Sequence, residues 1–194
     1  MDKMTTNARR RTSDSGFSLL EAVIALLLLM VGLMAMAQVL YAGLSIASTS
    51  TPNLVAREKA REAIESVHTA RDTHTVLWAQ IRNVGPPAVC PVGTTGVGGG
   101  EFENGDLDML APGPDGLVNT ADDDGRESTP GPDNLLGTSD DVPLEGYSRQ
   151  VDICDVDGNE NLRQITVTIS FQASNAFGQR RRQYQLVTLI SRFS

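Results

Sequence analysis

The pattern of hydrophobic and polar positions divides the chain into an apolar stretch, an amphipathic stretch, a polar middle and an alternating C-terminal part. From residue 17 to residue 56 the only charged side chain is Glu21. Residues 22–41 give 20 positions that are nearly all apolar or small, and a helix of about 20 residues spans a bilayer core of about 30 Å. The pattern therefore predicts a membrane-spanning helix at residues 17–44.

Residues 45–84 continue at the helical period but with a mixed surface. Small and apolar residues recur every three or four positions across residues 56–81, and charged residues occupy the other faces. Thr51 and Pro52 suit either the start of a helix or a bend within one long helix. We expect an amphipathic helix that packs one side on a sheet and is ended by the Gly-Pro-Pro sequence of residues 85–87.

Residues 147–194 alternate with a period of two and predict an antiparallel β-meander. The expected strands are residues 147–154, 162–171 and 184–193, with a turn at 173–179 between the last two. The Asp-Gly and Gly-Asn pairs within residues 155–159 predict a hairpin turn, because such pairs supply positive φ angles. In the middle strand apolar positions alternate with hydroxyl-bearing ones. We expect Ile165, Val167, Ile169 and Phe171 to face inward and Thr166, Thr168 and Ser170 to face outward.

The predicted helix and meander together indicate an α+β fold. The segment between them, residues 85–146, is predicted to form loops. A Gly- and Thr-rich stretch at 92–100 predicts a flexible linker. Residues 101–160 hold 17 acidic residues and two arginines, a local charge of −15, and the whole chain carries −8. This charge disfavours nucleic-acid binding, which needs a clustered positive field. We expect the short basic run Arg180–Arg182 to offset the negative charge of acidic loops, either in the same subunit or in a neighbouring one.

The N-terminal 16 residues are polar and contain more basic than acidic side chains. Because positive residues beside a membrane helix stay in the cytoplasm, we expect the N-terminus there and the rest of the chain across the membrane. An alternative is a secretory signal peptide cleaved after the small-x-small triplet at residues 35–37. Glu21 argues against that alternative, since a carboxylate in an apolar helix costs up to about 2.5–3.5 kcal/mol and a signal has no use for it.

The stretch Gly16–Glu21, followed by a long apolar helix, resembles the class III leader of type IV prepilins and type II secretion pseudopilins. The resemblance implies that a prepilin peptidase cleaves after Gly16 and methylates the new N-terminus, Phe17. It also implies that Glu21 pairs with the N-terminal amine of a neighbouring subunit during assembly. Such a pair would neutralise both charges in a medium of low dielectric constant and set the register between neighbouring helices.

Further features are similar to minor pilins of the PilV kind and to minor pseudopilins. No proline interrupts residues 17–51, where many major pilins carry one, and the similarity extends weakly to residues 31–33, 56–65 and 186–192. The resemblance implies a pilin-like fold and a structural, minor subunit of a type IV pilus or type II secretion pseudopilus. It implies residence in the inner membrane, with the C-terminal domain periplasmic or extracellular, before entry into the filament. The implied partners are other pilin or pseudopilin subunits, the prepilin peptidase and the inner-membrane assembly platform.

The acidic middle contains an internal repeat with a spacing of 18 residues. Residues 112–123 and 130–141 are identical at eight of twelve positions. Such self-similarity predicts that one local structure is built twice.

The repeats supply candidate ligands for calcium, which takes about six to eight oxygen ligands from carboxylates and carbonyls. The candidates are Asp115, Asn119, Asp122, Asp123, Asp124, Asp133, Asp140 and Asp141. Similar loops occur in exported bacterial proteins, some thought to bind calcium, and some major pseudopilins bind calcium in a comparable loop. The alternative is a solvated acidic loop without metal. A membrane-anchored or secreted calcium-binding adhesion module is thus the second functional hypothesis. No motif combines a nucleophile, a base and an orienting group, so we do not expect an enzyme.

The chain has two cysteines, Cys90 and Cys154, which we expect beyond the membrane, where disulfides persist. A bridge across their separation would stabilise the fold by about 4 kcal/mol on the chain-entropy model. Two buried thiols are the alternative, and an exported domain with only these two cysteines favours the bridge.

Overall fold

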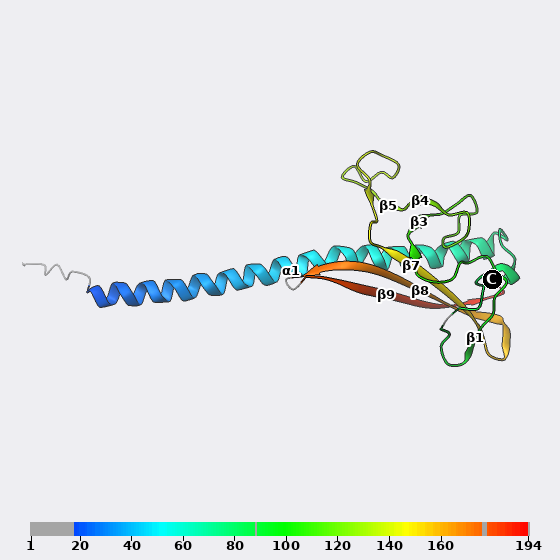
Figure 1. Ribbon diagram of the computed structural model, residues 1–194, viewed down its shortest axis with the longest axis horizontal. Helices are drawn as coiled ribbons and strands as arrows, with labels where there is room; N and C mark the ends of the chain where they lie inside the picture. The colour runs from blue at the N-terminus through cyan, green and yellow to red at the C-terminus, as the bar shows by residue number, and fades with distance from the viewer. Residues whose placement is uncertain (1–17, 88, 176–177, 194) are drawn as a thin grey trace, which may run out of the picture. The chain divides into compact units, whose positions relative to one another are not determined.

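The computed structural model describes residues 18–87, 89–175 and 178–193 (Figure 1). The chain forms two compact units, Met1–Leu44 and Ser45–Ser194. The described part contains one long helix followed by an antiparallel sheet, so the predicted α+β class is confirmed.

The one α-helix of the described residues, α1, runs from Leu19 to Asp72 and includes Pro52 without ending there. In the first unit, the carbonyl of Ser18 accepts hydrogen bonds from the backbone of Glu21 at 2.9 Å and of Ala22 at 3.2 Å. The span Leu19–Leu44 has a mean hydropathy of 2.6 over its most apolar window and buries none of that window. By length and composition it can cross a membrane, a property that signal sequences near an N-terminus share.

The amphipathic part of α1 ends at Asp72, so the prediction of a helix to residue 84 is wrong. His74 has a φ of 59°, and its backbone N–H donates to the carbonyl of Arg71 at 3.1 Å. The N–H of Thr75 donates to the carbonyl of Ala70 at 3.0 Å. These two bonds form the Schellman motif that ends many helices.

The apolar residues beyond the helix end keep a helical spacing by coincidence. Val76 and Ile81 are buried although they lie on irregular backbone, on either side of the short 3-10 helix η1 (Trp78–Gln80). Periodicity alone does not distinguish such a turn from another helical turn.

The main sheet is antiparallel and has the order β1-β7-β8-β9, with β2 also paired to β7. Its long strands are β7 (Ser148–Val156), β8 (Asn159–Asn175) and β9 (Gly178–Ser191). The predicted hairpin turn is confirmed between β7 and β8, where Gly158 has a φ of 76°. The turn predicted at 173–179 is largely strand, because Ala173 pairs with Arg180.

The segment predicted as loops, residues 85–146, contains six short strands. They are β1 (Thr94–Gly96), β2 (Leu107–Asp108), β3 (Leu110–Ala111), β4 (Asp124–Arg126), β5 (Ser128–Thr129) and β6 (Val142–Pro143). β3 pairs with β4, and β5 pairs with β6. The predicted flexible linker at 92–100 is wrong, because β1 joins the sheet beside β7. Gly96 is required there, since a Cβ would lie 2.9 Å from the ring of Pro87.

On the edge of β7 opposite β8, β1 and β2 pair with the two ends of the strand and leave its middle without a strand neighbour. The buried side chain of Asn83 fills this gap. Its Nδ2 donates to the carbonyl of Val151 at 2.7 Å, and its Oδ1 accepts from the N–H of Ile153 at 2.8 Å. One amide side chain thus satisfies the backbone as a strand would.

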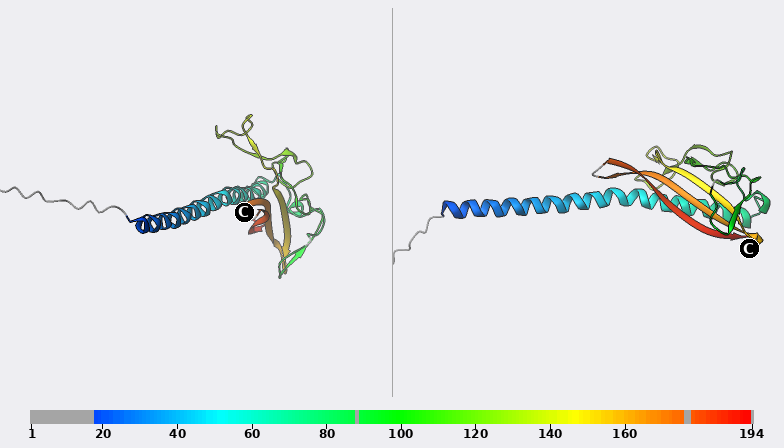
Figure 2. Two further views of the ribbon diagram at one scale, coloured as in Figure 1. Left: turned by 60° about the vertical axis from the view of Figure 1, so that its left-hand side comes forward. Right: turned by 60° about the horizontal axis from the view of Figure 1, so that its bottom comes forward.

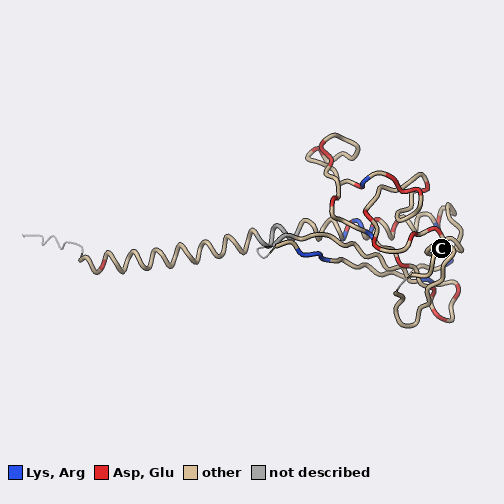
Figure 3. Tube along the Cα trace, viewed as in Figure 1, with Lys and Arg blue, Asp and Glu red and all other residues tan. Residues whose placement is uncertain are grey.

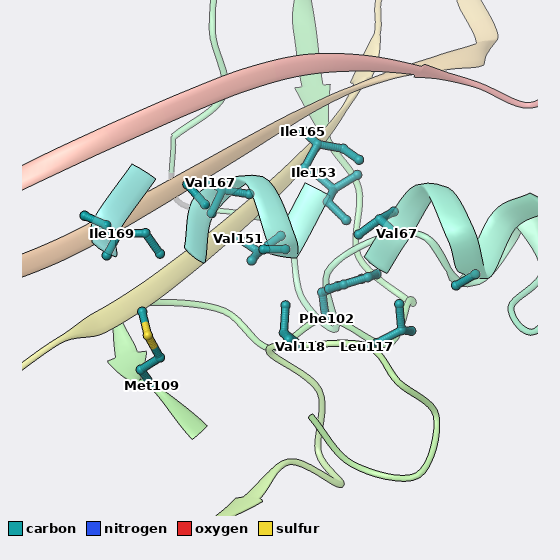
Figure 4. Packing of buried hydrophobic residues seen from close by; sticks show 14 of the residues in the cluster. Val67, Phe102, Met109, Leu117, Val118, Val151, Ile153, Ile165, Val167 and Ile169 are labelled. Carbon is teal, nitrogen blue, oxygen red and sulfur yellow. The ribbon is translucent and has the colours of Figure 1, made fainter. Parts of the chain in front are cut away.

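The core lies between the second part of α1 and the main sheet (Figure 4). The helix contributes a buried stripe of small residues, Ala56, Ala60, Ala63 and Val67, and the sheet contributes Val151, Ile153, Ile165, Val167, Ile169 and Phe171. The inward positions predicted for β8 are therefore confirmed, but Thr166 and Ser170, which were predicted to face outward, are also buried, at 8% and 1% exposure. Phe102, Met109, Leu117 and Val118 of the middle segment also belong to the cluster.

Cys90 and Cys154 form a disulfide, with Cα atoms 6.0 Å apart across a sequence separation of 64. Gly96 of β1 pairs with Cys154 of β7, so the bridge holds the segment leading into β1 against β7. The structure thus pairs the two cysteines as the sequence analysis favoured. A closed loop of this size corresponds to about 4 kcal/mol in the chain-entropy model.

Candidate functional site

Glu21 lies in the first turn of α1 and its side chain is exposed. It is the only charged residue of the Leu19–Leu44 span, and a carboxylate in a first turn interacts favourably with the helix dipole. The expected cleavage and methylation site, Gly16 and Phe17, lies outside the described residues.

The two acidic repeats have the same local structure, as the sequence predicted. In the first repeat the N–H of Leu117 donates to Oδ1 of Asp115 at 2.7 Å. Eighteen residues later, the N–H of Leu135 donates to Oδ1 of Asp133 at 2.8 Å. These are Asx turns, in which an aspartate replaces a backbone acceptor.

A second aspartate closes each loop in the same way. The Asp115 N–H lies 3.4 Å from Oδ2 of Asp122, and the Asp133 N–H lies 3.4 Å from Oδ2 of Asp140. The hydroxyl of Thr120 also donates to Oδ1 of Asp122 at 2.8 Å, and the hydroxyl of Thr138 donates to Oδ1 of Asp140 at 2.5 Å. Each of these hydrogen bonds lowers the pKa of the carboxyl group that accepts it. A Cβ on Gly113 would lie 2.4 Å from Oδ2 of Asp122, so the loop needs this glycine.

Two of the differences between the repeats exchange glycine with asparagine at positions of positive φ. Gly116 and its equivalent Asn134 have φ angles of 72° and 57°, and Asn119 and its equivalent Gly137 have 68° and 87°. Glycine and asparagine are the residues that adopt this conformation most readily. The backbone geometry therefore explains both exchanges.

The last aspartates of the two repeats, Asp123 and Asp141, accept hydrogen bonds from the backbone across the same turn. Oδ2 of Asp123 accepts from the N–H of Asn119, and Oδ2 of Asp141 accepts from the N–H of Gly137, each at 2.6 Å. The surroundings of these two aspartates differ, because the first repeat is built into the domain and the second is largely exposed.

A buried group of four charges surrounds Asp123. Its carboxylate lies 3.6 Å from the guanidinium of Arg149, which lies 3.1 Å from Glu127, and Glu127 lies 2.6 Å from Nζ of Lys59. The side chains of Arg149, Asp123, Glu127 and Lys59 are only 2, 4, 6 and 11% exposed. We call this group the buried charge network; it joins α1, β7, the first repeat and the residue between β4 and β5.

The network is electrically balanced, with two positive and two negative groups. Burial disfavours the charge on Lys59, but hydrogen bonds and charges from Glu127 and Glu62 outweigh burial and raise its pKa. Burial lowers the pKa of Arg149 against the opposing charges of Glu127 and Asp123. Glu127 opposes the effect of burial on both cations, so it is the carboxylate that the two share.

The sequence analysis did not anticipate the roles of Lys59, Glu127 and Arg149. A signal was present, since Arg149 is one of two arginines among 17 acidic residues in residues 101–160. Lys59 is likewise one of two lysines in the chain, the other being Lys3. No spacing in the sequence indicated which carboxylate either cation would meet.

Within the described residues, the candidate calcium ligands Asp115, Asp122 and Asp123 lie close enough together for their charges to interact. No group of three or more His, Cys, Asp or Glu side chains is arranged there to hold a metal ion. Asp124 accepts from the N–H of Gly125, and the Asn119 side chain donates to the carbonyl of Glu103. Burial and the charges of Asp122 and Asp123 raise the pKa of Asp115. Hydrogen bonds therefore close both loops, and calcium remains a hypothesis from the sequence.

A groove of about 410 Å³ lies between α1 and the first repeat. All four charged side chains that line it are acidic, namely Glu58, Glu62, Glu65 and Asp115. Figure 3 shows how widely acidic residues are distributed between α1 and β7. The groove therefore disfavours anionic ligands.

Comparison of the chain with protein-family models, curated proteins and solved structures gave no match.

The buried charge network predicts a large effect for Glu127→Gln, which leaves Arg149 with Asp123 at 3.6 Å and Lys59 with only the partly exposed Glu62 at 2.8 Å. We expect the free energy of unfolding to fall by about 3–5 kcal/mol, measured by denaturant titration of the full chain in detergent with the disulfide intact. Arg126→Gln is the control, because its pair with Asp108 is 3.4 Å long and its side chain is 39% exposed. The control should change stability by less than about 1 kcal/mol, and equal effects of the two variants would contradict the network's role.

Calcium binding can be tested on the same preparation. Because an ion must displace hydrogen bonds from carboxylate oxygens, we expect a dissociation constant no tighter than about 10⁻⁴–10⁻³ M, measured by calorimetric titration. The double variant Asp122→Asn with Asp140→Asn should remove the heat. Absence of both heat and a thermal shift at about 10 mM calcium would reject the calcium hypothesis.

Proposed function

We propose that the chain is a structural, minor subunit of a type IV pilus or type II secretion pseudopilus. The observation that carries the proposal is the exposed apolar span Leu19–Leu44, which has one carboxylate, Glu21, in its first turn. Gly16 and Phe17 precede this span in the sequence, at the spacing that a prepilin leader requires.

The apolar span supports a role in assembly because its side chains need an apolar environment. The large hydrophobic residues along it, from Leu19 to Leu44, are exposed within the chain. A lipid bilayer provides that environment before assembly, and the packed helices of neighbouring subunits would provide it afterwards.

Glu21 supports the same role because a carboxylate at this depth needs a partner. Among the described residues the apolar span contains no basic side chain. Cleavage after Gly16 would create an amine at Phe17, and that amine on a neighbouring subunit is a suitable counter-ion. The pair would then fix the axial register between neighbouring helices that otherwise make only apolar contacts.

On this proposal the prepilin peptidase and the inner-membrane assembly platform act on the chain while it is in the inner membrane. The N-terminus is cytoplasmic, and residues 45–194 lie on the periplasmic or extracellular side. The disulfide between Cys90 and Cys154 supports an oxidising compartment for that part. The absence of proline from residues 17–51 favours a minor subunit.

The second candidate is a membrane-anchored or secreted calcium-binding adhesion module. The duplicated acidic loop, with its crowded carboxylates around Asp115, favours it. In this candidate the apolar span only anchors the chain, so Glu21 has no assembly role.

Mass spectrometry of the N-terminal peptide, from protein recovered from cell envelopes, tests the proposal directly. We expect the mature chain to begin with N-methylated Phe17. A chain that begins at Gln38 would identify a signal peptide and would remove the assembly role of Glu21.

Substitution of Glu21 by alanine separates the two candidates. We expect Glu21→Ala to reduce incorporation into filaments about tenfold or more, because the partner amine would remain unpaired, with membrane insertion unchanged. Glu58→Ala removes an exposed carboxylate of the same helix and serves as the control. Unchanged incorporation of Glu21→Ala, measured in sheared filament fractions, would favour the adhesion module.

A further inference from the structure

Each acidic repeat contains a pair of large apolar residues, which is buried in the first repeat and exposed in the second. In the first repeat Leu117 is 0% and Val118 is 2% exposed. The residues 18 positions later, Leu135 and Leu136, are 61% and 63% exposed. The same turn therefore presents its apolar pair to the core in one copy and to solvent in the other.

The first repeat shows what the motif contacts when it is docked. Leu117 and Val118 lie in the core cluster with Phe102 and Val67 (Figure 4). Six residues after Leu117, the carboxylate of Asp123 lies 3.6 Å from the guanidinium of Arg149. The docking surface for this motif is thus an apolar depression with an arginine at its side.

The second repeat has neither component within the described residues. Asp141, the equivalent of Asp123, forms no ion pair there, and its Oδ1 is shielded from solvent without a hydrogen-bond partner. In the first repeat the corresponding oxygen of Asp123 accepts from the hydroxyl of Thr120 at 3.1 Å. The loop that carries Leu135 and Leu136 stands away from the main sheet (Figure 1 and the left view of Figure 2).

The exposed loop is nevertheless ordered by its own hydrogen bonds. Asp133, Asp140 and Asp141 close it with the same backbone contacts as in the first repeat. The backbone that carries the apolar pair is therefore closed as in the docked repeat before any partner arrives, which lowers the entropic cost of binding.

The charge of the loop restricts the class of partner. Three aspartates surround two leucines, and they would be repelled by an anionic bilayer surface or by nucleic acid. A protein surface that carries a guanidinium next to an apolar depression matches both the leucines and the carboxylates, as the first repeat demonstrates within this chain.

We propose that the second repeat, residues 130–141, is a docking loop for another protein that presents an apolar depression flanked by an arginine. Leu135 and Leu136 enter the depression, and Oδ2 of Asp141 pairs with the arginine, as Oδ2 of Asp123 pairs with Arg149 in the first repeat. This surface does not depend on the filament role, because an anchored adhesion module would present the same loop.

The test uses the full chain in its own cell envelope, with a photoreactive benzophenone amino acid at position 136. The matched control carries it at position 92, because Val92 is fully exposed and lies outside both repeats. We expect irradiation to give one discrete protein adduct at position 136 and none at 92. The crosslinked peptide of the partner should map to an apolar surface that contains an arginine.

Two substitutions then test the chemistry of the contact. Asp141→Asn keeps an acceptor for the Gly137 N–H but removes the charge, and we expect the adduct to fall about tenfold. Leu135→Ser should also abolish the adduct and should leave the unfolding midpoint unchanged. Leu117→Ser, its equivalent in the first repeat, should lower that midpoint by about 10 °C.

Several outcomes would overturn the proposal. They are an adduct confined to lipid or to the same chain, an adduct insensitive to both Asp141→Asn and Leu135→Ser, and a loss of stability in Leu135→Ser as large as in Leu117→Ser. Processing at Phe17 is scored separately in the same samples. A methylated chain without the adduct rejects the docking loop alone, and an adduct on an unmethylated chain rejects the filament role alone.

Discussion

The buried charge network of Lys59, Glu127, Arg149 and Asp123 is the constraint on which the architecture of the C-terminal unit depends. Isolated charges in a protein interior cost several kcal/mol each, so each member requires the others. Because the network draws one residue from α1, one from β7 and two from the acidic middle, it fixes a highly acidic segment against the helix and the sheet. The small side chains of the alanine stripe allow α1 to lie close to the sheet. The ion pairs of the network then hold the first repeat, and not the second, against the helix and the sheet.

This constraint also explains why two nearly identical repeats have different roles. Both loops close through the same aspartate contacts, so their local structure does not depend on the network. Only the first repeat has Arg149 beside its last aspartate and a core beneath its apolar pair. The second repeat keeps the same chemistry at the surface, which makes it available to a partner.

The two units are suited to two different environments. The span Leu19–Leu44 has no interior of its own and is suited to lipid or to the helices of other subunits. Residues 45–194 bury a conventional core and carry a disulfide that suits an oxidising compartment. A subunit that first resides in a membrane and later packs into a filament would need this division, because the apolar helix serves both environments.

The sequence by itself determined the features that depend on neighbours along the chain. These are the apolar helix around Glu21, the alternation of β8, the Asp-Gly hairpin turn and the duplicated loop, since periodicity and turn chemistry are local properties. The tertiary structure alone decided where α1 ends, that β1 joins the sheet instead of forming a linker, and that Asn83 substitutes for a strand. It also decided that Lys59 and Arg149 meet Glu127 and that Leu117 is buried while Leu135 is exposed. These outcomes depend on contacts between residues far apart in sequence, and no local pattern encodes the distance between two such residues.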